Sequence, residues 1–296
     1  MITLKSNRLR VEVALPGHMP NTTTRFNRAG FISEVILDED FRFCASEPRN
    51  LNHETSGGRG LCCEYTADLS GDCQDGTHYP KLGVGLIPIE HTPYHFWGRY
   101  EGIDAFEVEW GATDDQIMFR TIAKPCEGYA VEEVKIVTVK NNQILMETQI
   151  MNVGTKAIDT EEYCHNFLSL DGMALGRDYE LMLPIIKQQP RRRLMNCNDE
   201  MGCFCGIPGG VGFCEMAAVA SMLIFPDEEI NKEINASWTM YHHGAGISVS
   251  EEDSFPASWV GIWATDHILS PEIKHRISIK PGEKDTFTRC WTFDMI

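Results

Sequence analysis

The sequence predicts an all-β fold, a sandwich of antiparallel sheets that forms a single domain over residues 1–296. Alternation of apolar and polar residues with period two dominates the chain, whereas stripes with the period of a helix are scarce. Turn signals separate the strand candidates along the whole length. No linker, low-complexity segment or internal repeat divides the chain, so one large domain is expected.

The N-terminal half contains the clearest strand signals. A hairpin is expected at residues 134–152, because two alternating runs flank Asn141-Asn142, and Asn tolerates the left-handed backbone of a tight turn. A second hairpin turn is expected at Asp38-Glu39-Asp40. Strands are expected in this half at residues 2–15, 31–37, 41–44, 106–110, 117–122, 134–140 and 143–152.

The C-terminal half continues the pattern less regularly. Pro281-Gly282 supplies a last turn. Residues 188–214 are expected to form a long loop or insertion, and long loops tend to carry function. Short helices are expected at residues 215–225 and 227–233, and strands at residues 180–185, 236–240, 247–250, 259–264, 276–279 and 286–293.

Composition narrows the classes of partner and compartment. The formal net charge of -17 argues against nucleic acid or an anionic membrane surface, which both need a basic face. No apolar run approaches the roughly 20 residues of a membrane span, and the first residues lack the layout of a signal peptide, so a cytoplasmic protein is expected. The eleven cysteines are interpreted as mostly reduced and buried. A homodimer is compatible with these features.

The most informative stretch is residues 161–172, EEYCHNFLSLDG, which follows the clear hairpin. His165 lies there between carboxylates and an apolar run. An imidazole can exchange protons near neutral pH, so His165 is the leading catalytic candidate. The alternative is a core histidine that forms a hydrogen bond with Glu161 or Glu162.

The run from Ile144 to Gly172 resembles the aldose 1-epimerase (galactose mutarotase) superfamily. The resemblance rests on the strand and turn Met151-Asn152-Val153-Gly154 and on the motif HNFLSLDG from His165. Residues 26–32, FNRAGFI, and the ending ISIKPGE with RCWTF are similar to that family's early strand and final hairpin.

This resemblance implies a twisted supersandwich with a sugar site on a concave face. It implies isomerisation of a small-molecule sugar without a cofactor. In such chemistry a base removes the proton of the anomeric hydroxyl, an acid protonates the ring oxygen, and the ring opens and recloses. His165 falls on the position of the family's acid.

The base is where the chain departs from the family. The family's glutamate ends a late strand, and here Trp263 or Ala264 occupies that place. The nearest carboxylates are Asp266 and, after Ser270-Pro271, Glu272. We assign the role of base to Asp266. The alternative is that Asp266 is only a turn residue whose side chain forms a hydrogen bond with its own backbone. A carboxylate is expected about 5–9 Å from the His165 ring, by analogy with paired acid and base groups on sugars.

Several further residues are candidates for substrate binding. His78 lies in a segment that resembles parts of relatives near the site. His95 lies in a segment that is rich in aromatic residues. A planar Arg fork suits a carboxylate or phosphate, and Trp suits a sugar face. The expected substrate-binding residues are His78, His95, Glu162, Arg28 and Trp263.

Two alternatives to an isomerase remain open. One is a carbohydrate-binding protein that has lost the base. The other is a metal-dependent β-sandwich enzyme. Its ligands would come from cysteines and histidines, although the usual C-x₂₋₄-C spacing of structural zinc sites is absent. These residues are Cys197, Cys203, Cys205, Cys214, His242 and His243.

Overall fold

The structure is a computed structural model that describes residues 1–18, 24–47, 55–73, 76–187, 204–214 and 220–296. The predicted all-β class is confirmed. Within these ranges the helical elements are three single 3-10 turns, η1 (Ser70–Asp72), η2 (Ile89–His91) and η3 (Asp227–Glu229). No helix in these ranges is long and apolar enough to span a membrane.

The first large sheet has the strand order β1-β2-β3-β5-β13-β21-β20-β17 in the described part of the chain, with β4 paired to β3. All its pairings are antiparallel. Its strands are β1 (Ile2–Lys5), β2 (Leu9–Val13), β3 (Ile32–Leu37), β4 (Phe41–Arg42), β5 (Gly60–Tyr65), β13 (Ile158–Phe167), β17 (Ser221–Ile224), β20 (Trp259–Ala264) and β21 (Leu269–Ile279).

The second large sheet has the order β15-β16-β14-β18-β19-β22-β12-β11-β10-β9 in the same ranges and is also antiparallel. Its strands are β9 (Val108–Ala112), β10 (Gln116–Thr121), β11 (Val131–Lys140), β12 (Gln143–Asn152), β14 (Tyr179–Met182), β15 (Phe204–Ile207), β16 (Gly210–Phe213), β18 (Ser237–His242), β19 (Ile247–Asp253) and β22 (Lys284–Met295).

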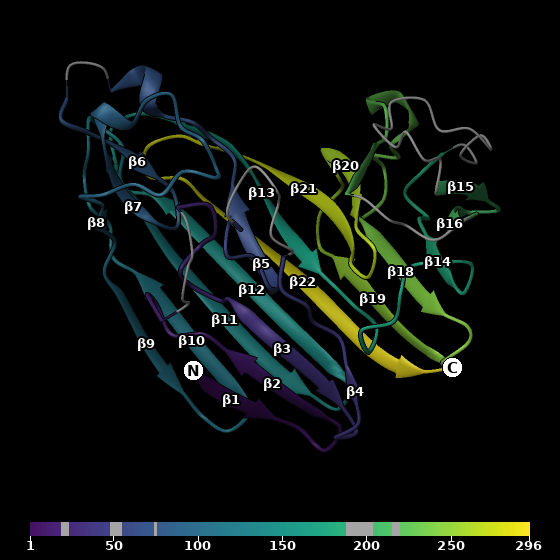
Figure 1. Ribbon diagram of the computed structural model, residues 1–296. Coiled ribbons are helices and arrows are strands. Elements are labelled where there is room, and N and C mark those ends of the chain that lie inside the picture. Colours follow the sequence, from purple (N-terminus) through teal and green to yellow (C-terminus); the bar gives the residue numbers. More distant parts are fainter. Residues whose placement is uncertain (19–23, 48–54, 74–75, 188–203, 215–219) are drawn as a thin grey trace.

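The two sheets lie one over the other, and Figure 1 shows β1 to β3 over β10 to β12. A small sheet of β6 (His78–Lys81), β7 (Gly85–Pro88) and β8 (Asp104–Ala105) lies at one end. The main apolar core contains buried residues of both sheets, such as Val35 and Leu61 from the first and Ile144 and Phe293 from the second.

The predicted hairpins are confirmed. Strands β11 and β12 pair along their whole length around Asn141, whose φ of 51° is the left-handed conformation expected at that turn. Asp38 and Glu39 also have positive φ and connect β3 with β4. Gly282, with φ 82°, lies in the turn between β21 and β22.

The following local predictions are wrong. Residues 2–15 form the hairpin β1–β2 instead of one strand, because Ser6 Oγ accepts hydrogen bonds from the backbone N–H groups of Arg8 and Leu9 and stabilises a turn. The helix expected at residues 215–225 is replaced over Ser221–Ile224 by strand β17, whose burial alternates with period two against β20. The helix expected at residues 227–233 is only the turn η3.

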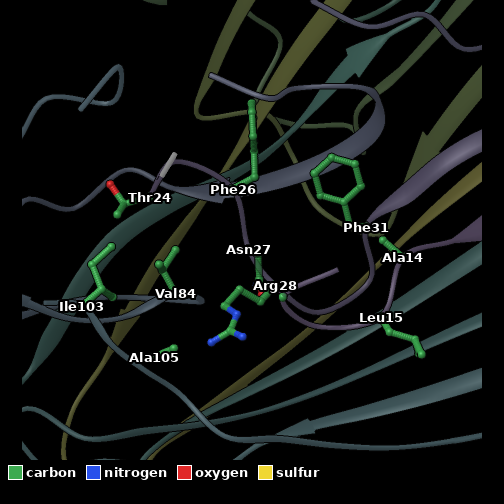
Figure 2. Close-up of a pocket in the computed structure, with 11 residues that line it drawn as sticks. Ala14, Leu15, Thr24, Phe26, Asn27, Arg28, Phe31, Val84, Ile103 and Ala105 are labelled. Atoms are coloured by element: carbon green, nitrogen blue, oxygen red, sulfur yellow. The ribbon is translucent and has the colours of Figure 1, made fainter. Parts of the chain in front are cut away.

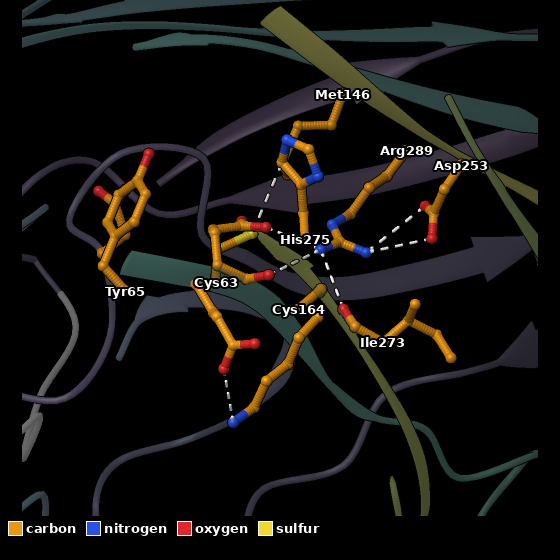
Figure 3. A network of polar contacts seen from close by, with 12 residues as sticks. Cys63, Tyr65, Met146, Cys164, Asp253, Ile273, His275 and Arg289 are labelled. Carbon is orange, nitrogen blue, oxygen red and sulfur yellow. Dashed lines mark hydrogen bonds and ion pairs between the residues drawn. The ribbon is translucent and has the colours of Figure 1, made fainter. Parts of the chain in front are cut away.

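A buried ion network joins the two sheets (Figure 3). Arg289 on β22 donates through Nη2 to Glu162 on β13 at 2.7 Å and through Nη1 to Glu251 on β19 at 2.9 Å. Asp253 lies 3.4 Å from Nη1, and every one of these side chains is at most 1% exposed. Burial and the neighbouring Glu251 hold the pKa of Asp253 well above its usual value.

Removing the cation from this network is expected to destabilise the fold. Arg289→Met leaves buried carboxylates without their partner, and we expect a loss of about 3–5 kcal/mol in the free energy of unfolding. Urea denaturation measures this. Arg276→Met is the matched control, since Arg276 pairs with Asp159 in an exposed ion pair and is expected to cost less than about 1 kcal/mol. Equal losses in the two variants would contradict a structural role for the network.

Candidate functional site

Strand β13 presents two different faces because its side chains alternate. Glu162 and Asn166 point into the sandwich, where they bind Arg289 and Glu251 respectively. His165 lies on the opposite, outer face, where its ring contacts those of Tyr163 and Phe167. The prediction that Glu162 positions substrate hydroxyls is therefore wrong, because its carboxylate is fully buried in the ion network.

Two residues of strand β21 contact the His165 ring on that outer face. The imidazole Nε2 lies 3.2 Å from Glu272 Oε1. The other ring nitrogen, Nδ1, shares a hydrogen bond of 2.9 Å with Ser270 Oγ. Ser270 and Glu272 are two residues apart on one strand, so they point to the same face and fix the ring from both sides.

Aromatic rings enclose the rest of the imidazole. Phe167 stacks on it with a centroid distance of 3.8 Å and an interplanar angle of 1°. Trp263 and Phe26 meet it edge-on at 5.4 and 6.2 Å. Only 4% of the His165 side chain is exposed, so the ring is held in one orientation and is shielded from bulk water.

Burial changes the protonation of the pair. It lowers the pKa of His165 well below its usual value, and the charge of Arg25 lowers it further. Burial also raises the pKa of Glu272 to about 7, although Arg25 opposes this. The imidazole is therefore neutral at neutral pH, while the carboxyl group exchanges its proton in that range.

A buried polar cluster adjoins the pair on the same face. Arg25 donates through Nε to Glu64 Oε2 at 2.8 Å and through Nη2 to the Tyr163 hydroxyl at 2.8 Å. Lys81 Nζ lies 3.3 Å from the other oxygen of Glu64. Burial raises the pKa of Glu64, but Lys81 and Arg25 outweigh it, so this pKa lies below its usual value and the carboxylate stays charged.

The face becomes more open along β21 away from Phe167. Lys274 pairs with Glu161 at 3.3 Å and lies over the ring of Trp259 at 4.6 Å. Gly261 faces Glu272 across the ladder, and a Cβ there would lie 2.1 Å from the Trp259 ring. The glycine thus lets an indole ring lie against the strand beside Glu272, with half-buried Trp263 further along.

The structure places a different carboxylate beside His165 from the one expected. The carboxylate that contacts His165 is Glu272, not Asp266. Asp266 lies in the turn between β20 and β21, where its side chain is 64% exposed and binds His267 Nδ1 at 2.6 Å. Thr265 and Ile268 close this turn by hydrogen bonds, which hold Asp266 at its tip. The expected separation of 5–9 Å is also wrong, because Glu272 and His165 are in direct contact.

The remaining predicted residues are dispersed. Trp263 does border the His165 ring. His78 is half-buried on β6 and pairs with the Thr77 hydroxyl, while His95 is exposed in the following loop. Arg28 lines a separate hollow and donates to the Phe106 carbonyl. None of the contacts found in the described ranges brings these three residues to His165.

The sequence also left several site residues unassigned. Ser270, Arg25, Glu64, Lys81 and Tyr163 surround the His165–Glu272 pair. The period-two spacing of Ser270 and Glu272 after a turn was the available signal for two of them. Arg25 comes from a segment without regular structure, and nothing in its neighbours predicts its position.

The metal alternative depended on cysteines and histidines. Cys197 and Cys203 lie outside the described residues. Among the residues that are described, no group of three or more His, Cys, Asp or Glu side chains comes together in a way that would hold a metal ion.

Solved structures with the same fold are aldose 1-epimerase-like and galactose mutarotase-like proteins. A putative aldose 1-epimerase from Escherichia coli K12 is 12% identical, with 99% of this chain and 98% of that chain covered and a TM-score of 0.59. A galactose mutarotase related enzyme from Lactobacillus acidophilus is 14% identical, with 99% and 97% covered and a TM-score of 0.57.

A galactose mutarotase-like protein from Lactobacillus casei is 11% identical, with 99% and 100% covered and a TM-score of 0.58. No protein-family model matches the chain, and no curated protein sequence matches it. At these identities the likeness shows the galactose mutarotase-like fold alone, and it confirms the fold predicted from the sequence.

The raised pKa of Glu272 predicts a pH-dependent contribution to stability. Between the ordinary Glu pKa of about 4.3 and about 7, the folded state keeps a proton that the unfolded state loses, so stability from this group is lost as pH rises through that window. Glu272→Gln cannot titrate. We therefore compare the free energies of unfolding of the two proteins. The wild-type value minus the value of the variant should fall by about 3 kcal/mol between about pH 4 and pH 8.

Denaturation of both proteins over that pH range measures the difference. His165 is present in both, so its own titration largely cancels. A difference that does not change with pH would show that Glu272 has an ordinary pKa in the folded protein.

Proposed function

We propose that the protein acts on a sugar or sugar derivative and interconverts its anomers, with Glu272 as the proton-transferring group and His165 as the residue that positions and tunes it. The observation that carries this proposal is the contact of 3.2 Å between His165 Nε2 and Glu272 Oε1, on a carboxyl group whose pKa is about 7. General acid–base catalysis is most effective when the pKa lies near the working pH. The fold, shared with aldose 1-epimerase-like structures, favours a sugar as the substrate, although fold alone does not assign a function.

The two oxygens of Glu272 have different surroundings. Oε1 faces the imidazole, and no hydrogen bond to Oε2 is found in the described part of the chain. The side chain is 8% exposed. Oε2 is therefore the atom that we assign to the substrate, with the half-buried ring of Trp263 as a stacking surface for a pyranose.

The proposed reaction balances in protons. Glu272 takes the proton from the anomeric hydroxyl and passes this same proton to the ring oxygen as the bond between the anomeric carbon and the ring oxygen breaks. Rotation of the resulting aldehyde and the reverse steps give the other anomer. Neutral His165 cannot easily become the charged acid, so its role is to donate to or accept from Oε1 and thereby set how readily the carboxyl group releases its proton.

A carbohydrate-binding protein without catalysis is the second candidate. Two observations favour it. The direct contact between His165 and Glu272 leaves no space for a sugar between them, and the His165 ring is buried. Ser270 does not offer a nucleophilic alternative, because it is fully buried behind the imidazole.

Anomer exchange measured by NMR with a panel of aldoses, including acidic and phosphorylated ones, tests the proposal. Glu272→Gln should lower the exchange rate at least about 100-fold, the scale of general acid–base catalysis. His165→Gln should lower the rate and shift its pH profile, which a purely structural role would not do. Asp159→Asn is the control, since Asp159 lies on the outer face of the same strand but is exposed and paired with Arg276.

Three outcomes would count against this assignment. Full activity in Glu272→Gln removes the role of that carboxylate. Loss of activity in Asp266→Asn, with Glu272→Gln unaffected, would return the role to the turn residue. Sugar binding without any rate enhancement in the wild type would establish the binding protein instead.

A further inference from the structure

A hollow is lined by Phe26, whose ring also contacts that of His165 (Figure 2). It has a volume of about 230 Å³ and lies between the N-terminal segment and the β7–β8 region. Its walls are predominantly apolar, formed by side chains such as Ala14, Leu15, Phe31, Val84 and Ile103. The volume is below the roughly 300–1,000 Å³ of sites for drug-sized ligands, so the occupant would be small.

Among the described residues that line it, the hollow contains one cation without a counterion. Arg28 lies between the apolar walls in Figure 2 and donates through Nη1 to the Phe106 carbonyl at 3.3 Å. It forms no ion pair with any carboxylate in the described ranges, and burial lowers the pKa of its guanidinium group. The adjacent Asn27 amide donates to Glu133, so it does not compensate for this charge.

The backbone makes room for this guanidinium group. A Cβ at Gly17 would lie 2.9 Å from Arg28 Nη2, and Gly17 has a φ of 76°, which side chains rarely adopt. The position of Arg28 therefore depends on a glycine in the wall. A half-buried guanidinium that carries its charge into an apolar hollow is a favourable partner for an anionic group.

An unsatisfied hydroxyl provides an independent observation. Thr24 lines the same hollow, is 1% exposed, and its Oγ1 has no hydrogen-bond partner among the described residues. Its backbone carbonyl is already used by the Tyr94 hydroxyl. A buried hydroxyl without a partner costs free energy, which an oxygen of a bound molecule would recover.

From these observations we propose that the hollow is a binding site for a small organic carboxylate with an apolar body. The carboxylate binds Arg28, the body fills the space between the apolar walls, and a further oxygen of the molecule pairs with Thr24. This site is separate from the His165–Glu272 pair and its test does not depend on any activity toward sugars.

Isothermal titration calorimetry of the full chain with hexanoate, hexanol and hexylamine tests the charge requirement. Hexanoate should bind at least about tenfold more tightly than hexanol, since hydrogen bonds to charged groups contribute about 1.5–3 kcal/mol, and hexylamine should not bind. Arg28→Gln should remove this preference while hexanol still binds, which also shows that the variant is folded. Arg28→Lys keeps the charge and should retain most of the affinity for hexanoate.

Thr24 is tested with omega-hydroxyhexanoate. This molecule should bind several-fold more tightly than hexanoate, and Thr24→Val should remove that gain without changing the affinity for hexanoate itself. Equal affinity of the wild type for hexanoate and hexanol would overturn the proposal. Unchanged hexanoate binding in Arg28→Gln would also overturn it, and so would a failure of all these probes to bind. Tighter binding of hexyl phosphate than of hexanoate would overturn the choice of a carboxylate.

Discussion

A buried cation, Arg289, joins the two large sheets, and a second, Lys135, lies 3.9 Å from the same Glu162. Arg289 on β22 binds carboxylates of β13 and β19, so three strands from both layers share a single guanidinium group. Charges placed in a sandwich interior need such partners, since their desolvation costs several kcal/mol each. Asn166 extends the connection, donating to Glu251 and accepting from the Trp291 indole. Because Glu162 and Asn166 are fixed inward by these contacts, the register of β13 is fixed, and His165 must face outward.

The same alternation explains why the candidate site is both rigid and dry. Once His165 is on the outer face of β13, the antiparallel register with β21 determines which side chains reach it. Ser270 and Glu272 bind the two ring nitrogens, and Phe167 covers one face of the ring. Burial that fixes the ring also moves the pKa of Glu272 to about 7. The geometry and the protonation behaviour of the pair therefore have one cause.

The sequence predicted the fold class and the local hairpins more reliably than the surroundings of His165. Hairpins such as β11–β12 are encoded by neighbouring residues, so alternation and turn chemistry suffice to find them. The partners of His165 lie on a distant strand whose pairing depends on the whole sheet. Glu162 was misplaced although it adjoins His165, because adjacent strand residues point to opposite faces and the inward one was not recognised as the partner of Arg289. Asp266 was chosen for its nearness to a strand end, where turn geometry holds it away from the face.

The position of the carboxylate also shows how an antiparallel sheet can supply one group from either of two strands. The resemblance implied a glutamate on the late strand β20, and Trp263 stands there instead. In the ladder, Trp263 pairs with Ser270 and Gly261 pairs with Glu272, so these four residues share the outer face. Paired positions have Cβ atoms about 4.5–5.5 Å apart. Side chains on β20 and on β21 can therefore reach the same space beside His165, and here the carboxylate comes from β21. In this chain β20 presents an indole and β21 places the carboxylate against the imidazole, and this contact is the source of the proton-sharing pair on which the proposed chemistry depends.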